Sequence, residues 1–206
     1  MQFFDPTVPI ATCDASNCGG CRVSDSIQCH FGPGDLFHFY LIFMPIPLVG
    51  GAGILAVGWV PLLIWIGLIV SFFGFIEIRV MCSHCPHYAE EGSTLKCWAN
   101  YGALKLWKYR PGPMSRAENV VFFASLAAVF GYPLGFLAAG GQWYLLVLYV
   151  LVTSVFWVSL KRFLCSQCMN FACPLNGVSE PTRQLFWAQN PRDGKAWDAV
   201  PEAHGE

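Results

Sequence analysis

Two long stretches of the chain contain no Asp, Glu, Lys or Arg: residues 36–76 and residues 119–160. A single helix of about 41 residues would be about 60 Å long, twice the thickness of the hydrocarbon core of a bilayer. Each stretch therefore predicts two membrane-spanning helices joined by a turn. The turns are expected at Gly58-Trp59-Val60-Pro61 and at Gly140-Gly141-Gln142-Trp143, because proline can open a helix and tryptophan favours the membrane interface.

The pattern thus predicts an all-α integral membrane protein with four transmembrane helices in two hairpins. The helices are expected near residues 37–57, 61–80, 119–139 and 143–164. Prolines lie at mid-span in the first and third of them, at Pro45, Pro47 and Pro133. Proline removes a backbone donor, so these positions predict kinks whose freed carbonyls must bond to neighbouring helices. The alternative is that the prolines mark a functional cavity.

The two hairpins share a repeated sequence. Arg79-Val80-Met81-Cys82-Ser83-His84-Cys85 follows the first apolar stretch, and Arg162-Phe163-Leu164-Cys165-Ser166-Gln167-Cys168 follows the second, 83 positions later (82 to 165). The same offset relates three further pairs within the stretches: Leu68 and Leu151, Ser71 and Ser154, Phe73 and Phe156. A third cysteine follows each pair, Cys97 in the first copy and Cys173 in the second. We interpret this as an internal repeat of an apolar hairpin followed by paired thiols.

Five segments follow from these patterns. They are a cysteine-rich N-terminal segment (1–35), transmembrane hairpin 1 (36–80), a cysteine-rich and basic loop (81–118), transmembrane hairpin 2 (119–164) and a cysteine-containing tail (165–206). Within the loop, residues 104–110 alternate apolar and basic side chains and are expected on the lipid headgroups, with Trp107 and Tyr109 pointing into the membrane. The tail beyond residue 174 is expected to be a loose extension, in which Leu185-Phe186-Trp187 can pack back on the protein.

Composition agrees with a membrane protein and indicates its orientation. The chain is 55% hydrophobic and 12% charged, whereas soluble domains average about 25% charged residues. Both hairpin turns lack basic residues, and Lys and Arg gather between the hairpins and after the last helix. Because basic loops stay in the cytoplasm, both termini and the 81–118 loop are expected there, in a multi-pass protein of the cell (inner or plasma) membrane. The net charge of −1 gives no reason to expect a nucleic-acid partner.

Cytoplasmic placement would put all ten cysteines in a reducing compartment, where metal or redox chemistry is more usual than disulfides. Two C-x-x-C pairs can together hold zinc or rubredoxin-like iron in a tetrahedral site. If the hairpins pack symmetrically, one such site would use the four cysteines Cys82, Cys85, Cys165 and Cys168, leaving Cys97 and Cys173 as extra ligands or free thiols.

A second partition uses the cysteines as triads. Cys82, Cys85 and Cys97 with His84 or His87 would form a zinc site of three thiolates and one imidazole. In the other copy, Cys173 precedes Pro174, as the last cysteine does in bacterial iron–sulfur motifs, although four residues separate it from Cys168. A fourth ligand would then come from elsewhere, and the N-terminal segment is the nearest candidate.

The N-terminal segment holds four cysteines within 17 residues: Cys13, Cys18, Cys21 and Cys29. The first three have the C-x4-C-x2-C spacing of plant-type ferredoxin ligands, but the fourth follows much sooner than in that class, so the fold is not implied. The segment lacks an apolar periodicity that could build a core. We expect it to fold around a metal or against the rest of the protein, and otherwise to be a flexible thiol-bearing tail.

Two further side chains are candidates for proton or quinone chemistry. Glu77 ends the second helix near the first cysteine pair, where it could take up a proton or bond to a quinone, or form an interfacial pair with Arg79. His38 lies inside the first span, near its expected cytoplasmic end, and an ordinary interfacial histidine is the competing interpretation.

These observations favour a membrane-embedded electron-transfer protein, or the membrane anchor of an oxidoreductase complex, that is quinone-linked. Its cofactor would be an iron–sulfur cluster or rubredoxin-like iron, and its partners the lipid bilayer and a cytosolic redox protein or other subunits. The alternative is a zinc-stabilised membrane scaffold without catalytic activity. A third hypothesis is thiol–disulfide exchange or the handling of soft metals.

Overall fold

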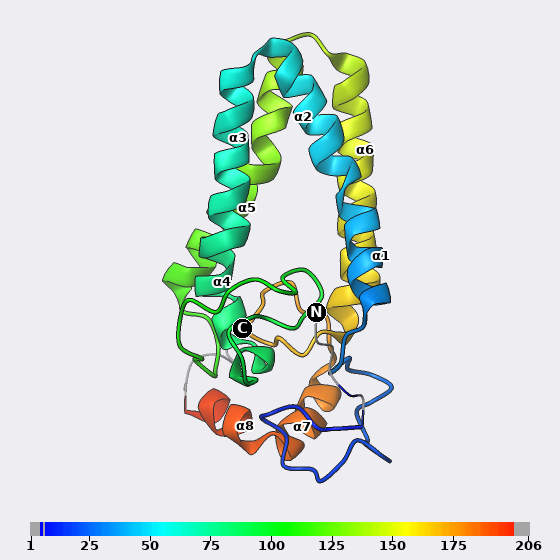
Figure 1. Ribbon diagram of the computed structural model, residues 1–206, viewed down its shortest axis with the longest axis vertical. Coiled ribbons are helices and arrows are strands. Elements are labelled where there is room, and N and C mark those ends of the chain that lie inside the picture. Colours follow the sequence, from blue (N-terminus) through cyan, green and yellow to red (C-terminus); the bar gives the residue numbers. More distant parts are fainter. Residues whose placement is uncertain (1–4, 6, 200–206) are drawn as a thin grey trace.

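The computed structural model describes residue 5 and residues 7–199, and regular secondary structure in this part is helical. β pairing among the described residues is limited to isolated bridges between Gln28 and Cys168 and between Thr94 and Leu104. Four helical runs in this part are long and apolar enough to cross a membrane: Pro33–Val57, Trp59–His84, Arg116–Ala139 and Trp143–Gln167. The prediction of an all-α fold with four candidate membrane spans is confirmed. In Figure 1 the four runs converge at the two hairpin turns and splay apart at the other end.

The first hairpin is built from several helical pieces. Span one consists of α1 (Pro33–Phe43) and α2 (Pro45–Val57), and span two of α3 (Trp59–Ser71), a π-helix (Phe72–Ile76), α4 (Glu77–Val80) and a 3₁₀ turn (Cys82–His84). A second 3₁₀ turn, Pro86–Ala89, follows. Span one begins four residues earlier than expected, because Pro33 opens the helix and the Asp35 carboxylate accepts from the Gly32 N–H at 2.7 Å.

The second hairpin is more regular. It consists of α5 (Arg116–Ala139), α6 (Trp143–Ser159), a π-helix (Leu160–Leu164) and a 3₁₀ turn (Cys165–Gln167). α5 starts at a reciprocal cap, in which the Ser115 hydroxyl accepts from the Glu118 N–H and the Glu118 carboxylate accepts from the Ser115 N–H. The predicted helix positions and the two turns are thus correct to within a few residues.

The closed end of the bundle is tightly packed around α2, which contacts α3, α5 and α6. Gly50 makes this approach possible, because a methyl group there would come within 2.9 Å of the Tyr149 ring, 3.0 Å of the Trp65 ring and 3.3 Å of Pro133. Small residues serve the same purpose in many membrane bundles, since packing rather than hydrophobicity drives helix association in lipid.

The kink expected at Pro133 is satisfied by neighbouring helices. Proline cannot donate to the carbonyl four residues before it, that of Val129. The indole N–H of Trp65 on α3 donates to this carbonyl at 2.8 Å, and the Tyr149 hydroxyl on α6 donates to the Phe130 carbonyl at 3.0 Å. The prediction that other helices would bond to the freed carbonyl is confirmed at this position.

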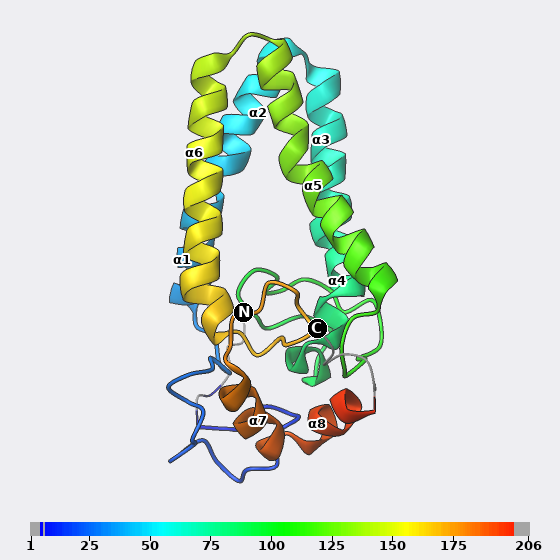
Figure 2. The ribbon, with the colours of Figure 1, turned by 180° about the vertical axis from the view of Figure 1, so that it is seen from behind.

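The splayed end results from the break in span one at Met44-Pro45. Beyond this break α1 packs on α6, while α3 and α4 stay with α5, so that the helices form two legs (Figures 1 and 2). The loops between residues 85 and 115 and between 168 and 178 lie between these legs. The outward surfaces of all four spans carry exposed apolar side chains that suit contact with a lipid bilayer, among them Leu41, Leu48, Leu63, Ile64, Val70, Val120, Val147 and Val155.

A compact cap closes the splayed end, and here two expectations were wrong. The tail is not a loose extension, because it forms α7 (Glu180–Gln189) and α8 (Pro191–Asp198). Phe186 and Trp187 are buried, as predicted for side chains that pack back on the protein. Trp107 and Tyr109 pack against a protein cluster around Ile78 and Leu95 rather than pointing into lipid. The Trp107 N–H donates to the Tyr88 hydroxyl at 2.9 Å, and the Tyr109 hydroxyl donates to Asp193.

Candidate thiolate site

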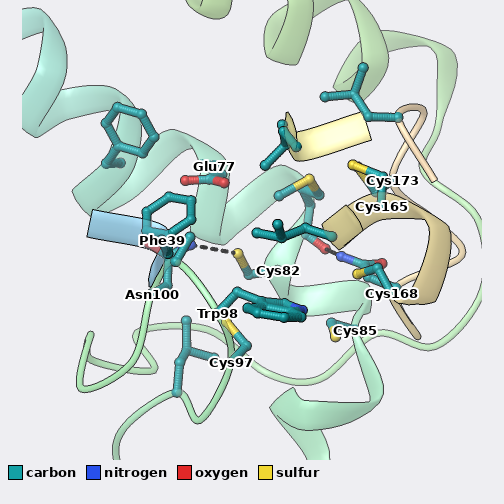
Figure 3. A pocket seen from close by; sticks show the side chains of 18 of the residues that line it. Phe39, Glu77, Cys82, Cys85, Cys97, Trp98, Asn100, Cys165, Cys168 and Cys173 are labelled. Atoms are coloured by element: carbon teal, nitrogen blue, oxygen red, sulfur yellow. Dashed lines mark hydrogen bonds between the residues drawn. The ribbon is translucent and has the colours of Figure 1, made fainter. Parts of the chain in front are cut away.

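Six cysteines from three separate segments line one cavity of about 160 Å³ at the splayed end of the bundle. They are the two C-x-x-C pairs and both third cysteines: Cys82, Cys85, Cys97, Cys165, Cys168 and Cys173 (Figure 3). An engineered cavity of about 150 Å³ in another protein admits one benzene molecule. The space is therefore of a size for one compact group.

The two C-x-x-C pairs have the same local conformation. Each begins a 3₁₀ turn at its first cysteine, Cys82 or Cys165, directly after a helix. The serine between the cysteines anchors each turn, since Ser83 Oγ donates to the Arg79 carbonyl at 2.7 Å and Ser166 Oγ donates to the Arg162 carbonyl at 2.8 Å. Equivalent residues of the repeated motif thus make equivalent contacts.

Loop contacts bring the C-terminal cysteines together. The Gly177 N–H donates to the Cys165 carbonyl at 2.9 Å, and the Asn176 amide donates to the Cys168 carbonyl at 2.6 Å. The Cys173 N–H donates to the Asn170 carbonyl at 3.2 Å. These bonds fold residues 165–177 into a compact loop that faces the first C-x-x-C pair.

Burial makes the cavity cysteines weak acids in the absence of a cation. It raises the pKa of Cys97 to about 11 and the pKa of Cys168 to about 12. The pKa values of Cys85 and Cys173 are also raised by burial, and the negative charge of the neighbouring Cys168 adds to the effect for both. All four thiols are therefore neutral near pH 7, and a bound metal ion would stabilise the thiolates by replacing their lost hydration.

The rest of the cavity wall is mostly apolar, with many aromatic side chains, and carries one buried carboxylate. Side chains from α1, the first π-helix, α5 and α6 form this wall: Phe39, Phe72, Phe73, Phe122, Phe130, Phe156 and Trp157. Glu77 lies at the cavity with only 7% of its surface exposed, and its Oε2 atom has no hydrogen-bond partner among the described residues. The Asn100 amide donates to Cys82 Sγ at 3.4 Å (Figure 3).

The two candidate histidine ligands lie in different surroundings. His87 lines the cavity, and burial lowers its pKa to about 3, so its imidazole is neutral, as metal binding requires. His84 instead bonds to the Gly112 carbonyl at 3.0 Å and to Arg110 Nη2 at 3.0 Å. Arg110 also pairs with Glu118 at 2.6 Å, so His84 belongs to a polar network beside the cavity.

Other predicted site residues lie away from this cavity. Arg79 pairs with Glu118 at 3.4 Å rather than with Glu77, so the interfacial pair considered for Glu77 does not form. His38 is exposed on the outer side of α1, with its ring against Phe37, and its proposed role stays a prediction. None of the four N-terminal cysteines lines this cavity.

Sequence reasoning missed the residues that surround the thiols. Trp98 and Asn100 line the cavity. They lie within three residues of Cys97, and this closeness in the sequence could have indicated their place at the site. The aromatic wall gave no signal, because phenylalanines in an apolar span are equally suited to lipid contact and to core packing.

As the side chains stand, no group of three or more Cys, His, Asp or Glu residues within 5 and 7–199 is arranged to hold a metal ion. A cysteine side chain can rotate about its χ1 torsion between staggered rotamers. Cysteines that line one cavity can therefore turn toward a common ion. Comparisons with protein-family models, with curated proteins and with solved structures found no match. The function must therefore be inferred from the geometry of the site itself.

Proposed function

We propose that this protein is an integral membrane electron-transfer protein, or the membrane subunit of a redox complex. Its cavity cysteines would hold iron, as an iron–sulfur cluster or as rubredoxin-like iron. The observation that carries the proposal is that all six cysteines of the repeated hairpins line one cavity beneath an aromatic wall. Thiolate is the usual ligand of iron–sulfur clusters. Carboxylates and imidazoles are few around the cavity, which counts against hydrolytic zinc.

The surroundings suit an electron carrier. A dry aromatic wall lowers the local dielectric constant, and hydrogen bonds to sulfur tune the reduction potential of a thiolate centre. Asn100 supplies one such bond to Cys82. Basic residues at this end of the spans and none in the hairpin turns favour a cytoplasmic location for the site, within reach of a soluble redox partner.

A quinone would have to dock beside the iron centre, because the cavity has room for one compact group. Glu77 lines the cavity, and its carboxyl group would bond to the quinone oxygen there. Reduction to the quinol needs two electrons, which the iron centre would pass singly, and two protons. We expect Glu77→Gln to slow the oxidation of the reduced centre by a short-chain quinone, while Ser154→Ala on the outer side of α6 leaves the rate unchanged.

Metal analysis and visible absorption of the anaerobically purified protein test the iron proposal. We expect a coloured protein that contains iron and loses both colour and iron in Cys82→Ser and in Cys168→Ser. The exposed Ser154→Ala variant is the control for purification losses.

A colourless protein whose zinc disappears in the same two variants would contradict the proposal and favour the zinc-stabilised scaffold. Retention of iron in Cys82→Ser and Cys168→Ser would show that the cavity thiols are not the ligands. Formation of disulfides between cavity cysteines during reaction with a quinone would favour thiol–disulfide exchange.

A further inference from the structure

The four N-terminal cysteines do not line the cavity. Cys13, Cys21 and Cys29 pack against one hydrophobic cluster that includes Ile10, Phe186 and the cavity cysteine Cys85. Cys18 is held next to Cys21 by a backbone hydrogen bond within the C-x-x-C turn. All four are partly exposed, whereas Cys82, Cys85 and Cys165 in the cavity are buried.

The backbone between Cys18 and Cys21 forms a short turn. The Cys21 N–H donates to the Cys18 carbonyl at 3.3 Å, which closes the turn across Gly19-Gly20. Gly20 has φ +72°, a left-handed conformation that residues with a side chain rarely adopt. Short turns of this kind direct both thiols of a C-x-x-C pair to one side, and this explains the glycine at position 20.

The segment that carries these thiols is held by packing rather than by secondary structure, since Ile10, Val23 and Ile27 are buried in the cluster with Phe186. Residues 7–32 contain no helix or strand, only turns and one isolated bridge. Contacts with the end of α7 dock it on the protein: the Asp14 N–H donates to the Gln189 carbonyl at 2.8 Å, and Thr12 Oγ1 donates to Asn190 Oδ1 at 2.8 Å. Small segments with a limited core commonly need a metal or a disulfide as a cross-link.

We propose that Cys13, Cys18, Cys21 and Cys29 together bind one Zn²⁺ ion at a structural site separate from the cavity. Closed sets of four thiolates from a short segment are typical of structural zinc. A divalent cation would offset the mutual repulsion of the four thiolates and contribute folding energy to a segment without regular structure. This inference is independent of the proposed iron centre, because the two groups share no cysteine.

A zinc ion bound by the N-terminal cysteines would also affect the cavity, because this segment contacts the cavity wall. Gln28, next to Cys29, donates its N–H to the Gln167 carbonyl at 2.9 Å, beside Cys168 in the cavity wall. Phe31, three residues beyond Gln28, lines the cavity and contacts the Trp98 ring at a centroid distance of 4.9 Å. A metal that orders residues 13–29 would thus also fix one side of the cavity.

Metal analysis of single cysteine variants of the full chain, purified anaerobically, tests this partition. We expect about one zinc per chain in the parent protein. Zinc should fall at least fivefold in Cys18→Ser and in Cys29→Ser and stay unchanged in Cys82→Ser. If iron is bound in the cavity, its content should fall in Cys82→Ser. Unchanged zinc in Cys18→Ser and Cys29→Ser, or loss of iron in place of zinc, would overturn the proposal.

A measurement on the unaltered protein covers the case in which these variants fail to fold. Alkylation followed by mass spectrometry should find the four N-terminal cysteines protected, and a zinc chelator should expose all four together. Modification of these cysteines at equal rates before and after chelation would overturn the proposal. The outcome does not depend on the metal content of the cavity.

Discussion

The two ends of the four-helix bundle use the same apolar composition for different purposes. At the closed end, α2 packs against three other helices, and the Gly50 contact leaves no room for even a methyl group. At the splayed end, α1, which precedes Met44, packs on α6, and a cavity lined by six cysteines lies between the helices. The comparison teaches that span one has a different role on each side of its proline-marked break: α2 carries the close packing at Gly50, and α1 borders the cavity through Phe39. The closed end sustains the fold, and the splayed end is available for chemistry.

The largest expected effect is at the closed end, from Gly50→Ala. The added methyl group meets three rigid rings, those of Tyr149, Trp65 and Pro133, which cannot move independently. We expect a loss of about 1–3 kcal/mol in the free energy of unfolding. Thermal unfolding in detergent would measure it. Gly135→Ala is the matched control, since a methyl group there has no neighbour within 4 Å and should be neutral or stabilising. Equal behaviour of the two variants would refute close packing around Gly50.

A smaller effect is expected from Trp65→Phe, which removes the donor to the Val129 carbonyl. A buried carbonyl without a partner costs about 1–2 kcal/mol, although measured values in membrane bundles are often lower. The informative measurement is a double-mutant cycle with Pro133→Ala. Residue 133 then regains an N–H that can bond to Val129, so the cost of Trp65→Phe should shrink. Strictly additive losses would contradict the compensation between Trp65 and Pro133.

The sequence predicted some features of these two ends and not others, and the reason is physical. Charge-free length, turn residues and the repeated cysteine motif located the four spans, both turns and the six cavity thiols. The need for a second helix to satisfy Pro133 also followed from backbone chemistry. The partners themselves, Trp65 and Tyr149, depend on which helix faces meet, and hydrophobicity around these spans is too uniform to reveal that. The same uniformity hid the aromatic wall, and the amphipathic helices of the tail were masked by its prolines.

In the cap, Tyr109→Phe should have an effect that depends on pH. Burial raises the pKa of Asp193 above 3.8, so the folded state holds this proton more tightly than the unfolded chain does. The free energy of unfolding therefore falls as the pH rises through the interval from 3.8 to the raised pKa. The Tyr109 hydroxyl donates to Asp193 and stabilises its carboxylate.

Removing that donor should cost about 1 kcal/mol at pH 7, where the carboxylate is charged, and much less at pH 4. Unfolding temperatures at the two pH values would measure the difference. Tyr144→Phe, at an outward position on α6 that is 81% exposed, is the control and should show no pH-dependent change. A loss from Tyr109→Phe of the same size at both pH values would rule out the bond to a charged Asp193.

The smallest effect is expected at the splayed end, from Leu126→Phe. Leu126 lies on α5 and lines the cavity, so a larger side chain can extend into free space. In the metal-free protein we expect a change within about 0.5 kcal/mol of zero, since surrounding groups need not move. Thermal unfolding, run beside Gly50→Ala, would compare the two ends directly. A loss as large as that of Gly50→Ala would show that the cavity region is as tightly packed as the closed end.

The most direct test of iron bound by the cavity thiols is X-ray absorption at the iron edge on the anaerobic protein. Six cysteines at the cavity predict a first coordination shell made of sulfur, and the sulfur signal should disappear in Cys82→Ser or Cys168→Ser. A first shell of nitrogen and oxygen alone, or a sulfur shell that both substitutions leave intact, would contradict the assignment of the splayed end as the redox centre.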